Sequence, residues 1–141
     1  MNDNYVRTNS MTAKEYIDMR AAVGWRIFAL EEAEEGLKHS YVWCVRDQGR
    51  PVAMGRIVWD HGYVVYIADV IVIPEYQGRG LGREIMENIM QFVQDKLKPG
   101  YKIMVSLESA KGKEGFYEKF GFVTRPNEIT GAGMHQWVVA E

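Results

Sequence analysis

The fold is decided by the stretch Asp69-Val70-Ile71-Val72-Ile73-Pro74-Glu75-Tyr76-Gln77-Gly78-Arg79-Gly80-Leu81-Gly82. Its β-branched run, 70–73, is typical of a buried strand. Pro74 lacks an N–H group, so the strand ends there. The glycines that follow lead into a long helical pattern, and the first turn of a helix has unpaired N–H groups and the positive end of the helix dipole. This arrangement predicts an anion site, and phosphate is the usual anion.

The glycine turn has a plainer alternative, which is a tight strand-to-helix connection without a ligand. It is not a P-loop, because no Gly-Lys-Ser/Thr follows, and the even spacing of Gly78, Gly80 and Gly82 differs from the dinucleotide-binding fingerprint. Three glycines in five residues are costly in conformational entropy for a mere turn. Arg79 and Arg83 add positive charge, so the sequence favours the phosphate interpretation.

Length and composition indicate one globular domain over residues 1–141. The formal net charge of -2 provides no basic footprint for nucleic acid. The one cysteine, Cys44, excludes an internal disulfide and a multi-cysteine metal site, and no metal is expected. We find no signal peptide and no apolar run long enough to cross a membrane, so we expect no membrane partner and a cytoplasmic location.

Periodicity and turn signals predict the other elements. A capping box of Thr12 with Glu15 starts the first helix, and Gly24 ends it. The predicted helices are 12–23, 31–38, 81–97 and 111–119, and the predicted strands are 5–8, 41–46, 51–59, 63–73, 101–107 and 134–140, with a further extended segment at 122–124.

These elements predict an α/β (α+β) fold with a mixed, mostly antiparallel central sheet and helices on both faces. Turns at 47–50 and 60–62 join three strands into an antiparallel meander. The strand–helix–strand passage through 81–97 favours a parallel pair with a right-handed crossover. The strand over 63–73 is apolar almost throughout, which predicts a central position in the sheet.

Two motifs connect these elements to a known family. The run Gln77–Gly82 matches the Gln/Arg-x-x-Gly-x-Gly/Ala signature of the GCN5-related N-acetyltransferase (GNAT) superfamily, and Phe116–Phe122 resembles its second signature. The helix and strand between the motifs have the length that the family uses. The resemblance covers about 41–122 and implies the GNAT (acyl-CoA N-acyltransferase) fold, in which the parallel strand pair splays apart.

The resemblance implies an acetyl-CoA site in the gap between the splayed strands. In the family, the pantetheine arm pairs with the backbone of the first strand, here Ile71, Val72 and Ile73, and the pyrophosphate binds amides of the glycine turn. Many members have an asparagine at the end of the second strand; here Ser109 substitutes for it or the contact is absent. The other implied cofactor-binding residues are Gln77, Gly78, Arg79, Gly80, Leu81, Gly82, Arg83, Phe116 and Tyr117.

The resemblance further implies direct attack of an amine on the thioester, without an acyl-enzyme. A strand amide near Val72 is the implied donor to the carbonyl oxygen. Tyr117 is the implied acid for the leaving thiolate, since a phenol has a pKa of about 10; the alternative is aromatic packing beside Phe116. The base stays open. Asp69 is either this base or a buried carboxylate that anchors the strands, Glu108 is either a base or a surface residue, and a water chain is a further candidate.

The acceptor pocket is the least defined part of the site. In the family, acceptor specificity resides in the first helical connector, which here includes Trp25 and Phe28; the alternative for both is core packing. Glu108 and Met134 are further candidate substrate-binding residues. An aromatic wall suggests a small aryl- or alkylamine, and the other hypotheses are a protein or peptide acetyltransferase and a non-catalytic CoA-binding sensor or interaction module. A homodimer is expected by analogy alone.

Overall fold

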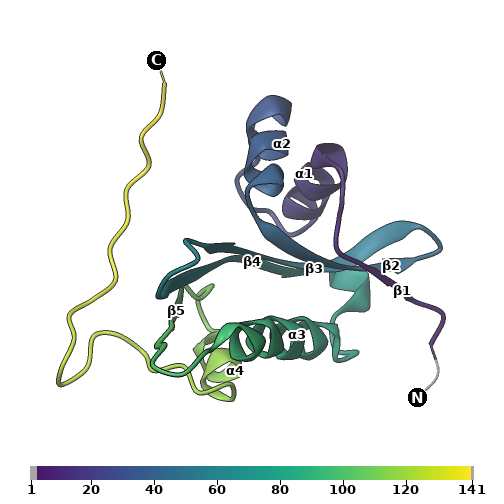
Figure 1. Ribbon diagram of the computed structural model, residues 1–141. Coiled ribbons are helices and arrows are strands. Elements are labelled where there is room, and N and C mark those ends of the chain that lie inside the picture. Colours follow the sequence, from purple (N-terminus) through teal and green to yellow (C-terminus); the bar gives the residue numbers. More distant parts are fainter. Residues whose placement is uncertain (1–2, 141) are drawn as a thin grey trace. The chain divides into compact units, whose positions relative to one another are not determined.

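The computed structural model describes residues 3–140 (Figure 1). The chain divides into two compact units, of which the first ends at Leu107 and the second begins at Glu108. In the first unit, five strands lie in the order β1-β2-β3-β4-β5. The elements of this unit are β1 (Val6–Thr8), α1 (Ala13–Ala22), α2 (Leu30–Lys38), β2 (Tyr41–Asp47), β3 (Arg50–Trp59), β4 (Val64–Val72), the 3-10 helix η1 (Pro74–Tyr76), α3 (Leu81–Lys96) and β5 (Met104–Leu107).

The sheet has the predicted mixed architecture. Strands β1 to β4 pair antiparallel in chain order, and β5 pairs parallel with β4. Helices α1 and α2 cover one face of the sheet and α3 covers the other (Figure 1). Strand β4 lies between β3 and β5, as its apolar sequence predicts. The parallel strand β5 is shorter than predicted, because β4 begins at Val64 and Val64 pairs with Met104, which leaves residues 101–103 without a strand partner.

Helix α3 approaches the sheet closely at one glycine of β3. A Cβ on Gly55 would lie 2.4 Å from Cγ2 of Ile85 and 3.0 Å from Cδ1 of Ile89. Both isoleucines are fully buried, as is Met86. A side chain larger than hydrogen would therefore push α3 outward, because packed cores have no room for an added methyl group. This contact fixes the distance between α3 and β3.

The second unit has less regular structure than the sequence predicts. Helix α4 (Glu114–Glu118) is shorter than the predicted 111–119, because Gly112 adopts a left-handed conformation (φ 86°) before it. The predicted strand over 134–140 is wrong: these residues form no strand, and Val138 is 87% exposed. The predicted extended segment 122–124 also pairs with no strand among the described residues. High β propensity does not make a strand without a neighbour to pair its amides.

Two predictions concern the whole chain: a single domain and the absence of a membrane-spanning segment. The single domain over 1–141 stays a prediction beside the two compact units. Among residues 3–140, no helix is both long enough and apolar enough to span a bilayer.

The predicted capping box forms at the start of α1. The Glu15 amide donates to Oγ1 of Thr12 at 3.1 Å, and the Thr12 amide donates to Oε1 of Glu15 at 2.9 Å. The same carboxylate forms a salt bridge with Arg46 of β2, with 2.7 Å between Oε2 and Nη1. The hydrogen bond from Arg46 is the main reason why the pKa of Glu15 falls from 4.5 to about 2. One side chain thus caps α1 and ties it to the sheet.

Replacing Glu15 with glutamine should make stability less dependent on pH in the acid range. The folded pKa of Glu15 is lowered, so its contribution is fully present above about pH 4.5 and is lost as the pH falls toward 2. We expect Glu15→Gln to lower the free energy of unfolding by about 1–2 kcal/mol at pH 7. The difference from the original chain should shrink between pH 4.5 and 2, measured by urea denaturation.

The matched control is Glu31→Gln, which changes an exposed carboxylate in the first turn of α2. It should shift stability by less than about 0.5 kcal/mol. A Glu15→Gln difference that stays constant from pH 7 to pH 2 would contradict the assignment.

Candidate active site

Strand β4 continues beyond its pairing with β5. The last pair between the two strands is Ile67 with Leu107, whereas β4 extends to Val72. The register of β4 against β3 shifts at this point, since Ile67 pairs with Ile57 but Asp69 pairs with Arg56. Ala68 is therefore the extra residue of a β-bulge, which bends the strand. The far part of β4, residues 68–72, has a partner in β3 but none in β5.

The backbone groups that face this open edge follow from the register. The amide of Ile73 donates to the Val52 carbonyl of β3 at 3.0 Å. Because successive residues of a strand turn their N–H and C=O groups to opposite edges, those of Val72 and Val70 face away from β3. The Gln77 side chain donates to the Val72 carbonyl at 2.9 Å. The open edge therefore presents the backbone groups of Val70 and Val72, whereas those of Ile71 and Ile73 face β3; the backbone contacts with pantetheine through Ile71, Val72 and Ile73 stay a prediction.

The glycine turn leads from η1 into α3. Gly78 and Gly80 have φ angles of 79° and 84°, which only glycine adopts without strain. A Cβ on either residue would meet no atom within 4 Å, so the left-handed conformation, and not crowding, requires glycine here. The first helical hydrogen bond runs from the Glu84 amide to the Gly80 carbonyl at 3.1 Å. The amides of residues 81–83 therefore have no partner within the helix, which is the arrangement that suits an anion; phosphate binding there stays a prediction.

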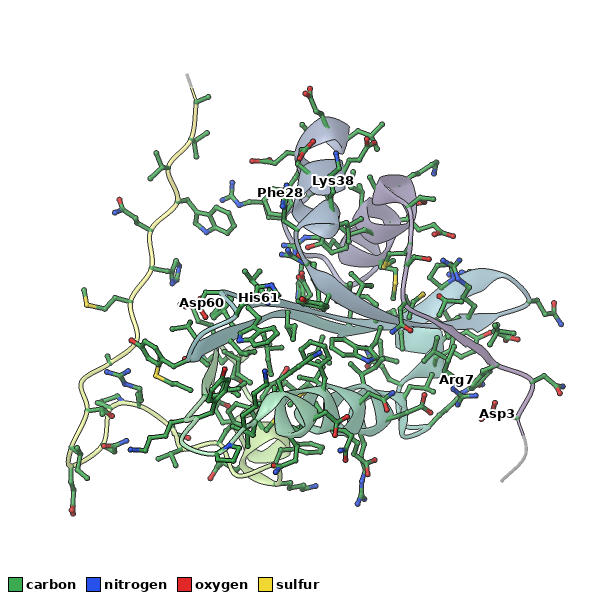
Figure 2. The ribbon with its side chains drawn as sticks, in the orientation of Figure 1. Asp3, Arg7, Phe28, Lys38, Asp60 and His61 are labelled. Carbon is green, nitrogen blue, oxygen red and sulfur yellow. The ribbon has the colours of Figure 1, made fainter. Side chains whose placement is uncertain are left out.

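The N-terminal segment braces this turn. Arg79 donates to the Tyr5 hydroxyl at 3.1 Å, and its guanidinium carbon lies 4.5 Å from the centre of the Tyr76 ring. Arg7 forms a salt bridge of 2.8 Å with Asp3 (Figure 2). It forms a second salt bridge of 2.8 Å with Glu84, in the first turn of α3. Residues near the N-terminus of the first unit thus hold the glycine turn and the start of α3. The second predicted arginine, Arg83, is exposed and pairs with Glu87 at 3.5 Å.

Asp69 lies in a buried cluster of donors. It is 3% exposed, and its carboxylate accepts hydrogen bonds from Arg20 at 2.6 Å, from Arg56 at 2.7 Å and from the hydroxyl of Tyr16 at 2.6 Å. Burial and the charge of Asp69 raise the pKa of Tyr16, so this phenol stays protonated and donates. A general base needs access to the proton of the substrate. The three contacts favour the anchoring alternative for Asp69, which ties β4 to α1 and β3.

Arg20, Arg56 and Tyr16 are residues that the sequence reasoning missed. A signal for them exists, because Arg20 falls in the apolar stripe of a helix and Arg56 falls in a largely apolar strand. Buried charges are paired, so two such arginines and an aspartate in the apolar strand 63–73 point to a cluster.

The predicted acceptor residues of the first unit lie next to this cluster. Trp25 and Phe28 are half-buried on the connector between α1 and α2. The guanidinium carbon of Arg20 lies 4.7 Å from the centre of the Phe28 ring and 5.5 Å from that of the Trp25 ring. The connector is thereby joined through Arg20 to the Asp69 carboxylate of β4.

The second unit contains Tyr117 in α4. Phe116 and Phe120 share a face, as predicted, with ring centres 5.4 Å apart. Tyr117 packs edge-to-face against Phe116 at 5.0 Å and lies 6.2 Å from Phe122, so it takes part in the aromatic cluster as well. Burial raises the pKa of Tyr117, which keeps its hydroxyl protonated at neutral pH. The ring is packed, and the role of its hydroxyl as an acid stays a prediction.

The other predicted residues of the second unit are more exposed. Ser109 is half-buried and donates to the Ala110 carbonyl at 2.7 Å. Glu108 lies 3.8 Å from Nδ1 of His135, and Met134 is 90% exposed. Their contacts with cofactor or acceptor stay predictions. Within residues 3–140, no group of three or more His, Cys, Asp or Glu side chains is arranged to hold a metal ion.

The first unit also has a cavity that β4 does not line. Its volume is about 410 Å³, and its walls come from residues 9–13, from α2 and from the start of β2. Glu34 and Lys38 are its charged lining residues. This cavity therefore differs from the open edge and the glycine turn in every lining element.

Comparison with known proteins identifies the family of this chain. The model of the acetyltransferase (GNAT) family matches residues 10–122. This chain belongs to the acetyltransferase (GNAT) family. A crystal structure of a protein from Staphylococcus aureus, described as a probable acetyltransferase, superposes on this chain with a TM-score of 0.84 at 31% identity. The match covers 95% of this chain and 99% of the other. The resemblance read from the two motifs is thus confirmed, and so is the fold.

Two curated relatives carry more specific names. Serotonin N-acetyltransferase 2, chloroplastic, from Oryza sativa subsp. japonica is 31% identical over 121 residues, which are 82% of this chain and 58% of the relative. Histone acetyltransferase TAP1 from Glycine max is 27% identical over 121 residues, which are 77% of this chain and 51% of the relative. The chain spans less than two thirds of the length of either protein.

The GNAT family generally uses acetyl-CoA, and the residues of the first unit fit that molecule. Coenzyme A carries two amides next to its thiol end and a pyrophosphate farther along. The open β4 edge offers backbone partners for amides, and the glycine turn directly after it offers N–H groups for phosphate. The order of these groups along the chain matches their order in the ligand.

Gly80→Ala should weaken CoA binding, because alanine does not tolerate φ near 84° and would turn the first amides of α3 away from the phosphate. We expect the Kd for CoA, measured by isothermal titration calorimetry, to rise about tenfold or more. Gly100→Ala is the matched control, since Gly100 has a φ of 86° and equally open surroundings after α3. Equal losses of affinity in the two variants would show that the turn does not hold the phosphate.

Proposed function

We propose that this chain transfers an acetyl group from acetyl-CoA directly to the primary amine of a small molecule, with an aryl- or alkylamine as acceptor. The observation that carries the proposal is the open edge of β4, which is followed at once by the glycine turn of α3. An edge with unpaired amides next to a helix N-terminus suits an extended ligand that has amide groups before a phosphate.

Each step then falls to a group of this chain. Acetyl-CoA, when bound, supplies the thioester carbon, to which the free amine forms a C–N bond while the C–S bond breaks. The Val72 amide, which faces the open edge, donates to the carbonyl oxygen as that oxygen gains negative charge. The Tyr117 hydroxyl gives its proton to the departing thiolate, and the raised pKa of Tyr117 keeps that proton in place beforehand. The nitrogen that has formed the C–N bond loses its extra proton to water as the amide forms, and the Tyr117 oxygen regains a proton from water.

The amine must first lose a proton, because an alkylammonium ion with a pKa of about 10.4 has no lone pair for attack. The three donors around Asp69 make this carboxylate an anchor in our proposal. The proton therefore passes to water or to Glu108, whose carboxylate is half exposed.

Two observations support a small amine with an aromatic or alkyl body. The connector presents two half-buried aromatic side chains, Trp25 and Phe28. A relative that is 31% identical is named for the acetylation of serotonin, an arylalkylamine. Pockets for small ligands are mostly apolar with a few polar groups that fix orientation.

A protein or peptide acceptor is the second candidate, and the name of the soybean relative, a histone acetyltransferase, is the observation in its favour. The third candidate, a CoA-binding sensor without turnover, is disfavoured by the presence of Tyr117 in the second motif. A cytoplasmic location and a homodimer also stay predictions; exposed apolar side chains in the last segment, among them Val138 and Val139, are the candidate dimer surface.

Tyr117→Phe should lower kcat for acetyl transfer about a hundredfold, because it removes the proton donor and keeps the ring that packs on Phe116. The assay follows thiol release from acetyl-CoA with the best acceptor found among arylalkylamines, polyamines, amino acids, aminosugars and peptides. Arylalkylamines are expected to be the best class.

The control for this variant is Tyr101→Phe, which removes the hydroxyl of an exposed tyrosine. It should leave kcat within about twofold. An unchanged kcat in Tyr117→Phe would refute the acid role, and tight CoA binding without turnover of any acceptor would point to the sensor.

A further inference from the structure

The connector between α1 and α2 is built around one guanidinium group. Arg20, near the end of α1, is 9% exposed. Its Nε donates to the Arg26 carbonyl at 2.6 Å, and the Trp25 amide donates to the Arg20 carbonyl at 2.9 Å. The guanidinium carbon lies 4.7 Å from the centre of the Phe28 ring and 5.5 Å from that of Trp25. The connector thus folds around the Arg20 side chain by hydrogen bonds and by cation–π contacts.

The same guanidinium group reaches the cofactor strand. Its Nη1 lies 2.6 Å from Oδ1 of Asp69, in a salt bridge whose side chains are 11% and 1% exposed. Asp69 stands next to the bulge of β4 and three residues before Val72, whose amide faces the open edge. Buried, charge-assisted hydrogen bonds hold their partners in one geometry. Arg20 therefore couples the position of the connector to the position of β4.

A second arginine in the cluster provides an internal comparison. Arg56 donates from Nε to the other Asp69 oxygen, Oδ2, at 2.7 Å, and its side chain is 17% exposed. Its Nη1 donates to Oγ of Ser40 at 2.9 Å, and its guanidinium carbon lies 5.5 Å from the centre of the Tyr16 ring. Arg56 thus binds the same carboxylate from β3 but turns to the residues after α2 and to α1.

We propose that Arg20 is a positioning residue for the amine acceptor: it holds the connector 25–28 against the cofactor strand and so sets the affinity for the acceptor. Arg56 stabilises the Asp69 carboxylate without this effect. The inference rests on the proposed function, in which Trp25 and Phe28 line the acceptor pocket. It predicts that two arginines on one carboxylate have different roles in catalysis.

The test compares Arg20→Lys with Arg56→Lys. Lysine keeps a positive charge for Asp69, but its single nitrogen cannot replace the planar fork that binds the carboxylate and a carbonyl while stacking on rings. We expect Arg20→Lys to raise KM for the acceptor about tenfold and to change KM for acetyl-CoA by less than about twofold. Arg56→Lys should leave KM for the acceptor within about twofold of the original value. Equal acceptor KM values in the two variants would overturn the proposal.

A second pair of variants covers the case in which Arg20→Lys does not fold. Asp69→Asn keeps the shape of the side chain but removes the charge that binds Arg20 and Arg56, whereas Tyr16→Phe removes one hydrogen bond to Asp69 and leaves both salt bridges. Thermal unfolding identifies which variants are folded. Asp69→Asn should raise KM for the acceptor and Tyr16→Phe should not; a rise in both, or in neither, overturns the proposal.

Hydrogen exchange of the connector amides separates this inference from the proposed function. The amides of residues 24–28 should exchange faster in Arg20→Lys than in Arg56→Lys, whatever the chain acetylates. If the original chain acetylates no amine, the proposed function fails, and the exchange rates alone decide whether Arg20 holds the connector. Equal exchange in the two variants refutes that role.

Discussion

The site depends on one constraint: β4 continues to pair with β3 beyond the point where its pairing with β5 ends. Beyond Ile67, the strand keeps its hydrogen bonds on one edge only, while the bulge at Ala68 bends it. A buried strand edge must find partners for its amides. Gln77 supplies one through its side chain, at the Val72 carbonyl. The open edge thus has backbone N–H and C=O groups that a ligand with amide groups can pair with. The fold places the glycine turn at the end of that same edge.

The surrounding structure holds this edge in place from both sides of the sheet. On the α3 face, Gly55 lets Ile85 approach the sheet, which fixes the helix whose first amides form the anion site. On the opposite face, Asp69 binds Arg20 and Arg56 and so joins β4 to α1 and to β3. Breaking a buried cluster of this kind is costly, because it leaves an unpaired charge. The cofactor half and the connector of the site are thus linked through one carboxylate.

Much of the fold could be predicted from sequence because its signals are local. The capping box of Thr12, the β-branched run before Pro74 and the helical stripe over 81–97 each depend on neighbouring residues, and the structure confirms all of them. The prediction of a strand over 134–140 was wrong, because a strand needs a pairing partner that lies far away in sequence. The β propensity of a segment does not indicate whether such a partner exists.

The site divides in the same way. The glycine turn could be predicted from the sequence because a φ angle near 84° requires glycine. The choice between Val72 and Ile73 depends on pairing with Val52, and the anchoring role of Asp69 depends on arginines 49 and 13 residues away. Such contacts have no local signal, although a charged residue within an apolar pattern indicates that a partner exists.

The most direct test of the central claim is a titration of the full chain with CoA, followed by the backbone amide resonances in a ¹H–¹⁵N NMR spectrum. The claim that the open edge of β4 and the glycine turn bind CoA predicts the largest shift changes at the amides of Val70, Val72 and residues 81–83. Changes confined to the amides of residues 9–13 and α2, around the other cavity, would contradict it.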